Sequence, residues 1–394
     1  MEIVLNIIEA AYYDDSLQTD DRLLQNCSLV CRQWSAPAQR LLFRHVTLRT
    51  QHAYLAFQRA VDRSTERGRM LGDAVVRLRV LLDHNQPFGL SQHAFAHAVT
   101  LCPNLYELNL SLYGRPSPGQ DVIGEPTASR MRRAAPSFGD DTLALLRSGP
   151  RITALQFCNW SENRQSLIQL LDVWPTTLRS LVVSGVPPQL PPASSLSPFP
   201  CQLRELRMNF QATPSLDFIK WLLHHSTHSL RVLELEREPS PDLLDHLVHA
   251  YGSTLESLSL PVCGSHDHAL AVQSCRRLRE FKVESAWVSP MVYRKLPASL
   301  QHVALGLDCD TALQPILDMV RSRDALSCVS VQVWDGGEQH PQLPALKLVC
   351  ASRGVDLRLT HDVRVFREMI VRLPLSRVFP QLSSPCSSEA TRFG

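Results

Sequence analysis

The most regular feature of the chain is an apolar triplet whose second and third members follow the first by three and five positions. The last two members are two positions apart, the spacing at which side chains of a β-strand point to the same side. The pattern therefore predicts a series of short strands, each with one buried face. Nine clear copies are Leu105/Leu108/Leu110, Ile152/Leu155/Phe157, Leu178/Leu181/Val183, Leu203/Leu206/Met208, Leu230/Leu233/Leu235, Leu255/Leu258/Leu260, Leu278/Phe281/Val283, Leu300/Val303/Leu305 and Leu326/Val329/Val331, with weaker copies at Val75/Leu78/Val80 and Val355/Leu357/Leu359.

Segments with helical character lie between the triplets. Asp140-Asp141 and Ser215 are suited to cap helix N-termini, and Pro241 suits a first helical turn. Alternating strands and helices predict an α/β fold in which each helix returns the chain to a parallel neighbouring strand. The predicted helices cover residues 140–147, 166–173, 215–225, 241–251, 311–321 and 344–353.

The distance between triplets identifies the kind of repeat. From Ile152 onward, successive copies begin 22 to 29 residues apart, which is the period of leucine-rich repeats. Such repeats stack into a curved solenoid with parallel strands on the concave face and helices outside. The alternative is an unrelated α/β protein with leucine-rich strands.

Two segments interrupt the repeats. Residues 114–139 are rich in Pro, Gly, Ser and Arg, and residues 186–201 contain six prolines, so both are predicted to be loop insertions. Residues 375–394 lack periodicity and are predicted to be a disordered tail. The predicted organisation is a helical module over residues 1–48, a solenoid over 49–374, and the tail.

Composition and charge exclude several classes of protein. Forty Lys and Arg against 38 Asp and Glu give a net charge of +2, which is too balanced for a protein that mainly binds nucleic acid or an anionic membrane. No apolar run approaches the ~18 residues of a membrane span, and no signal peptide is recognisable at the start. Eleven cysteines without paired spacing indicate reduced thiols, and hence the cytosol or the nucleus.

The first 48 residues show a different pattern. Ile3, Val4, Ile7, Ile8 and Ala11 have helical spacing and predict an amphipathic helix. A second helix is expected to begin at Leu23-Leu24 and to run through Leu29-Val30-Cys31-Arg32-Gln33-Trp34. A third is expected over residues 36–44, before a strand over residues 45–48.

This segment resembles the core of an F-box, because an L-V-C-R-x-W sequence follows an amphipathic helix and precedes the apolar helix of Gln39-Arg40-Leu41-Leu42-Phe43. The whole chain resembles fungal-type F-box proteins with irregular leucine-rich repeats. The resemblance implies that the module binds a Skp-type adaptor, which links it to a cullin and a RING subunit, and that the solenoid holds the protein to be ubiquitinated. The adaptor-binding residues that it implies are Ile3, Val4, Ile7, Leu29, Val30, Cys31 and Trp34.

One departure from the family leaves a second interpretation open. The Leu-Pro pair that usually precedes the first helix is missing, since the chain begins at Met1-Glu2-Ile3. Either the natural start lies upstream, or the module has lost part of its contact surface and only caps the solenoid. A repeat array needs an atypical terminal unit that hides its core, so a scaffold without an adaptor is the alternative function.

Catalytic chemistry is not indicated by the sequence. No glycine-rich phosphate loop, G-x-S-x-G or H-E-x-x-H motif is present. Cys263, His266, His268 and Cys275 lack the close Cys pair of a structural zinc site. We therefore expect no enzyme, no metal and no cofactor, although a hydrolase or transferase with a site dispersed over several loops is a further alternative.

The substrate of a solenoid receptor is expected to meet the outward positions of the strands. These positions carry mixed charges, and the acidic ones favour a basic partner segment. The sequence does not identify the substrate or a phosphate requirement. The candidate residues are Glu205, Arg207, Glu234, Glu236, Glu280, Lys282 and Glu284.

Overall fold

The computed structural model describes residues 7–8, 21–114, 136–191 and 197–369. The chain divides into two compact units, each described here by itself. The first comprises residues 1–261 and 274–276, and the second comprises residues 262–273 and 277–394. The predicted boundary at residue 48 stays a prediction.

The first unit contains eight parallel strands that follow one another in sequence order. The middle residue of each triplet pairs with its counterpart on the next strand, as in Leu78 with Leu108 and Leu108 with Leu155. Side chains along β4 to β6 alternate between buried and half-buried, which is the predicted one-faced burial. The strands are β1 His45–Leu48, β2 Arg77–Asp83, β3 Glu107–Tyr113, β4 Ala154–Trp160, β5 Ser180–Gly185, β6 Glu205–Phe210, β7 Val232–Leu235 and β8 Ser257–Leu260.

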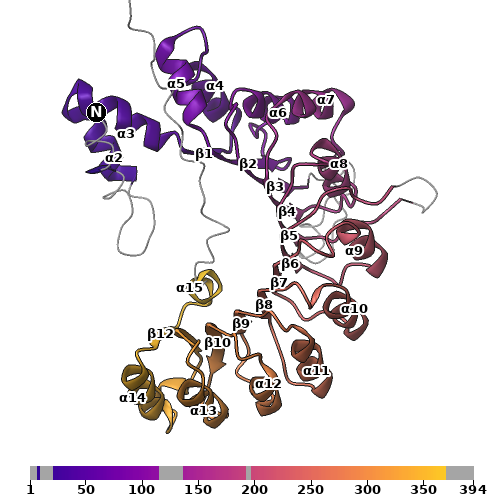
Figure 1. Cartoon of the computed structure of the whole chain (residues 1–394). Coiled ribbons are helices and arrows are strands. Elements are labelled where there is room, and N and C mark those ends of the chain that lie inside the picture. The colour runs from indigo at the N-terminus through magenta and orange to yellow at the C-terminus, as the bar shows by residue number, and fades with distance from the viewer. Residues whose placement is uncertain (1–6, 9–20, 115–135, 192–196, 370–394) are drawn as a thin grey trace, which may run out of the picture. The chain divides into compact units, whose positions relative to one another are not determined.

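Helices connect these strands, and Figure 1 shows α6 to α10 along one side of the strand series. The Ser215 hydroxyl accepts the Phe218 N–H, which confirms the predicted cap, and Pro241 lies in the first turn of its helix as predicted. The cap predicted at Asp140-Asp141 is wrong, because Gly139 is the N-cap and both aspartates lie in the first turn. The helices are α2 Asp21–Val30, α3 Arg32–Leu42, α4 Gln51–Ala60, α5 Glu66–Ala74, α6 Gln92–Thr100, α7 Asp140–Ser148, α8 Ser166–Val173, α9 Leu216–Leu223 and α10 Pro241–Tyr251.

The second unit repeats the same scheme with four parallel strands in sequence order. Its last helix, α15, packs against β11 and β12. The strands are β9 Glu280–Val283, β10 His302–Leu307, β11 Cys328–Val333 and β12 Asp356–Thr360. The helices are α11 His266–Ser274, α12 Pro290–Lys295, α13 Gln314–Ser322, the 3-10 turn η2 Gly337–Gln339, α14 Leu343–Arg353 and α15 Val363–Glu368.

The α/β repeat predicted from the triplets is confirmed, since all eleven copies form parallel strands. The six predicted helices are present: those at 166–173 and 241–251 have the predicted ends, and the other four are shifted, as in the helix expected from residue 311, which begins at Gln314. Residues 186–191 and 197–201 contain no helix or strand, as predicted for a loop. Most of the other predicted loop, at 115–135, and the predicted tail lie outside the described residues.

The predicted second helix of the N-terminal module is wrong in its extent. The chain is extended at Cys31, with φ −162° and ψ 169°, so α2 ends at Val30 and a new helix begins at Arg32. Trp34 therefore lies in the first turn of α3. Leu29, Val30 and Cys31 instead lie at the break between the two helices, where the chain changes direction.

Candidate functional site

The N-terminal helices enclose a small apolar core. Leu24 and Cys27 on α2 are three residues apart and face Ala38 and Leu41 on α3, and Ile8 completes the cluster. Leu23, Trp34 and Leu42 pack against its edge. This core orients the two helices and leaves the residues at the break between them outside it.

Apolar residues at that break are exposed to solvent. Leu29 and Val30 are 84% and 66% exposed, Cys31 is exposed, and Ile7 is 52% exposed. Among the described residues, Leu29 and Val30 are the only two consecutive large apolar side chains in this state. Single exposed apolar residues are ordinary, but adjacent ones mark surfaces that bind partners. We call Leu29, Val30 and Cys31 the apolar patch.

The structure separates the predicted adaptor-binding residues into three groups. Ile7, Leu29, Val30 and Cys31 are exposed. Trp34 is half-buried against the helical core. Ile3 and Val4 lie outside the described residues. Substitution of Trp34 therefore changes the packing of the module as well as any contact surface.

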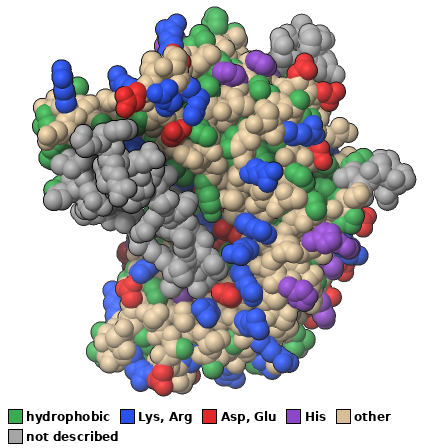
Figure 2. Space-filling model, turned by 45° about the horizontal axis from the view of Figure 1, so that its top comes forward, with side chains coloured by type: hydrophobic (Ala, Val, Ile, Leu, Met, Phe, Trp, Pro, Cys, Tyr) green, Lys and Arg blue, Asp and Glu red, His purple; other side chains and the backbone are tan. Residues whose placement is uncertain are grey.

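The outward face of β6 and β7 carries a ladder of paired charges. Arg207 bonds Glu205 on its own strand at 2.6 Å and Glu234 on the next strand at 3.0 Å. Glu236 accepts a hydrogen bond from Asn209 at 2.7 Å. All four predicted residues of this region share one face, as expected. Figure 2 shows Lys and Arg side chains interspersed with Asp and Glu over the visible surface, in keeping with the balanced net charge.

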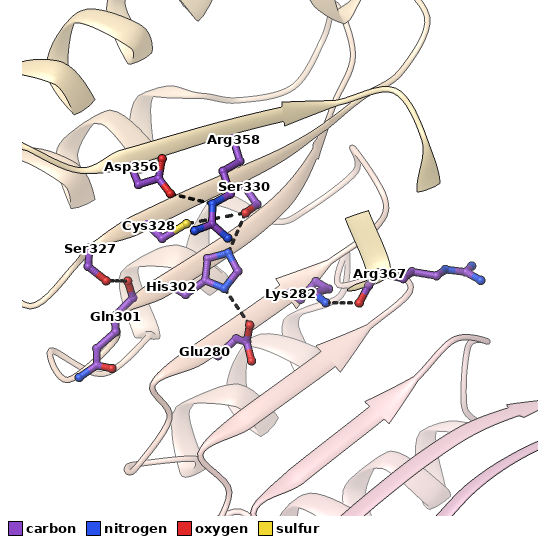
Figure 3. A network of polar contacts seen from close by, with 10 residues as sticks. All are labelled: Glu280, Lys282, Gln301, His302, Ser327, Cys328, Ser330, Asp356, Arg358 and Arg367. Carbon is purple, nitrogen blue, oxygen red and sulfur yellow. Dashed lines mark hydrogen bonds and ion pairs between the residues drawn. The ribbon is translucent and has the colours of Figure 1, made fainter. Parts of the chain in front are cut away.

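The outward face of β9 to β11 carries a second polar network (Figure 3). Parallel register places Glu280, His302 and Cys328 side by side on successive strands. The Nδ1 atom of His302 lies 2.7 Å from Glu280, and its Nε2 atom lies 2.9 Å from Ser330. All three side chains are buried.

Helix α15 contacts this face through two consecutive residues. The Lys282 ammonium donates to the Arg367 carbonyl at 2.8 Å and lies 5.9 Å from the centre of the Phe366 ring. The Arg367 guanidinium forms two hydrogen bonds with Glu284, at 2.7 and 3.1 Å. Glu280 and Lys282, predicted from sequence as substrate-facing residues, are buried in this conformation, and Glu284 is paired with Arg367.

The charge of His302 depends on its neighbours. Burial lowers its pKa, but hydrogen bonds to Cys328 and Glu280, with the Glu280 charge, outweigh burial and hold the pKa above its usual value. The Ser–His–Glu order matches that of a nucleophilic triad. Ser330 and His302 are fully buried, however, so a substrate does not reach them in this conformation.

The raised pKa of His302 predicts a pH dependence of stability. Its contribution is complete below the unfolded pKa of 6.5 and is lost as pH rises through the higher folded pKa. We expect the free energy of unfolding to decline as pH rises above 6.5, and this decline to be smaller in His302→Gln. Equal declines in urea unfolding of the two proteins would contradict the assignment.

A second histidine acts in the opposite pH range and does not obscure this test. Burial, with the charges of Arg77 and Arg44, lowers the pKa of His45 to about 4. Its protonation therefore destabilises the fold as pH falls below 6.5. The interval above pH 6.5 isolates the effect of His302 from that of His45.

The sequence prediction missed His302, Ser330, Phe366 and Arg367 as members of this face. The first two were detectable in principle, since they occupy outward positions of consecutive predicted strands. Phe366 and Arg367 had no local signal, because their contacts reach residues more than 80 positions away.

The cysteines and histidines show no arrangement for metal binding in the part of the chain that the structure describes. Burial raises the pKa of Cys263 to about 12 and that of Cys275 to about 11. Both thiols are therefore protonated at neutral pH. The ten described cysteines are all free thiols.

Comparisons with known proteins place limits on what the chain resembles. No family model matches it, and no curated protein matches it. Among solved structures it is similar to a chain in the "Crystal structure of Rad7 and Elc1 complex in yeast", at 13% sequence identity and a TM-score of 0.41, over 90% of this chain and 91% of that one. None of the described helices is long and apolar enough to cross a membrane.

Proposed function

We propose that this protein is a substrate-recognition subunit of a ubiquitin ligase of the Skp, cullin and F-box type. Its N-terminal helices bind a Skp-type adaptor through the apolar patch, and the outward strand faces hold a protein substrate. The chain itself catalyses no reaction in this proposal. The free thiols agree with the reducing cytosol or nucleus, where we expect it to act.

The observation that carries the proposal is the exposure of Leu29 and Val30 on an ordered helical module. Both residues belong to the L-V-C-R-x-W segment that resembles an F-box, and neither contributes to the module's own core. Burying a leucine side chain from water contributes about 2 kcal/mol. A partner that covers both side chains therefore gains substantial binding energy without unfolding the module.

The proposed substrate side rests on the polar character of the strand faces. Glu205 and Arg207 on β6 are paired with each other and half-buried, whereas Glu234 on β7, which also pairs with Arg207, is buried. A partner can therefore exchange the Glu205–Arg207 pair for its own charges. Such faces contribute specificity more than affinity. Glu205, Arg207, Glu234 and Glu236 remain the candidate contacts in the first unit.

We expect the double variant Leu29→Asp/Val30→Asp to lose a Skp-type adaptor in a pull-down while the chain stays folded. Two carboxylates at exposed positions disturb no packing but oppose burial in an apolar interface. Phe88→Asp is the matched control, because Phe88 is 81% exposed and lies outside the module. Retention of the adaptor by the double variant, or its loss in the control, would refute the proposed contact surface.

A scaffold capped by its N-terminal helices is the second candidate. Helix α3 packs against α5, and Arg67 donates to Gln39 at 3.1 Å, as a terminal cap requires. A cap does not account for the exposure of Leu29 and Val30. A folded wild-type chain that recruits no adaptor would favour this function.

A further inference from the structure

Burial of the outward strand face varies from strand to strand. Along β4 to β6 most outward residues are half-buried, and β12 is largely exposed, whereas every residue of β9, β10 and β11 is buried. Several outward positions of β9 to β11 are nevertheless polar, namely Glu280, Lys282, His302, Ser330 and Gln332. This is the chemistry of a binding face, and in this conformation it is covered.

Part of the cover is α15, and it uses few residues. In this six-residue helix only Phe366 is fully buried, Val363 and Arg367 are half-buried, and Arg364 and Val365 are exposed. The contacts are those of a short recognition motif: an apolar ring, a guanidinium and one main-chain carbonyl. Lys282 on β9 contacts the ring and the carbonyl, and Glu284 beside β9 binds the guanidinium.

Lys282 and Glu284 favour an aromatic residue followed by arginine. The Glu284 carboxylate bonds the guanidinium at two atoms, a geometry that arginine provides and lysine does not. Lys282 contributes a hydrogen bond to the carbonyl that follows the ring and a favourable position over the ring itself. The combination distinguishes an aromatic residue followed directly by arginine from other basic segments.

We propose that the outward face of β9 to β11 is a binding site for a partner protein segment with an aromatic residue followed by arginine, and that α15 occupies this site in cis. The inference deepens the proposed function by naming the chemistry of its substrate. A tethered segment competes at a high effective concentration, so a partner binds weakly until α15 is displaced. Short helices with one buried side chain are among the elements that open most readily.

The test uses a labelled peptide with the sequence of residues 361–369, His-Asp-Val-Arg-Val-Phe-Arg-Glu-Met, and the purified full chain without an adaptor. We expect Phe366→Ala/Arg367→Ala, which releases α15, to bind the peptide at least about tenfold more tightly than wild type. Arg364→Ala/Val365→Ala is the matched control, because both side chains are exposed on the same helix, and should bind like wild type.

Two substitutions test the chemistry of the site. A peptide with alanine in place of its Phe and its second Arg should lose binding to the released chain. Adding Glu284→Arg to the released chain should weaken the natural peptide about tenfold, and a peptide with Glu in place of that Arg should recover part of the loss. Peptide affinities that do not change with these substitutions, or equal affinities for the wild type and the released chain, would overturn the proposal.

A second measurement avoids the released variant altogether. Excess unlabelled peptide should accelerate amide hydrogen exchange in residues 363–368 of the wild-type chain, because it displaces α15. Unchanged exchange at saturating peptide would overturn the cis occupancy. Both assays omit the adaptor, so their failure is distinguishable from failure of adaptor binding.

Discussion

Gly185→Ala is expected to destabilise the first unit by about 2 to 6 kcal/mol, the sum of left-handed backbone strain and steric overlap. Gly185 ends β5 with φ +89°, and a Cβ atom there would lie 1.9 Å from the Asn159 carbonyl oxygen on the adjacent strand. That oxygen accepts the N–H of Val186 at 2.8 Å, so it cannot move without losing a bond. Amide hydrogen exchange in β4 and β5 measures the local loss of stability.

Gly354→Ala separates the two contributions. Gly354 also has a positive φ, of +68°, but a Cβ atom there meets nothing within 4 Å. Its replacement should cost only the left-handed strain, about 1 to 2 kcal/mol. If both variants lose the same free energy of unfolding, the close contact between the Gly185 position and Asn159 adds nothing to the backbone strain.

His302→Ala is expected to destabilise the second unit by about 3 to 5 kcal/mol, the range found when one member of a buried ion pair is removed. The substitution takes a hydrogen-bond partner from Glu280 and from Ser330, and both remain buried. The loss should appear in the hydrogen exchange of the β10 amides, and β5 in the first unit should be unaffected.

The double variant Glu280→Leu/His302→Leu provides the control. Replacing both members of a buried pair by apolar residues often restores stability, so the double variant should be more stable than His302→Ala. If the double variant is less stable than His302→Ala, the Glu280–His302 pair itself stabilises the fold, beyond the effect of leaving one charge unpaired. A double-mutant cycle then measures the coupling energy of the pair.

The strand series was predictable because it depends on local spacing. Residues such as Leu155, Leu181 and Leu206 recur at one repeat period and two positions before another apolar residue, which specifies both the strand and its buried face. Parallel register then follows, since equivalent positions pair. The outward position of Glu205 and Arg207 was predictable for the same reason.

The remaining features depend on contacts that local spacing does not encode. Helices α4, α5, α12 and α15 were not predicted. The break at Cys31 lies within a sequence of otherwise helical character. The orientation of α3 after the break depends on its packing against α2 and α5. The burial of Lys282 arises from Arg367, 85 residues away. A strand face and its cover that are so distant in sequence become neighbours only in the folded unit.

The most direct test of the central proposal is a titration of a Skp-type adaptor into the purified full chain. We predict a saturable complex whose dissociation constant rises at least about 100-fold in Leu29→Asp/Val30→Asp and changes less than about twofold in Phe88→Asp. Trp34→Ala is unsuitable as the main variant, because Trp34 also packs against the helical core. A folded wild-type chain that binds no adaptor, or a double variant that binds as tightly as wild type, would contradict the account.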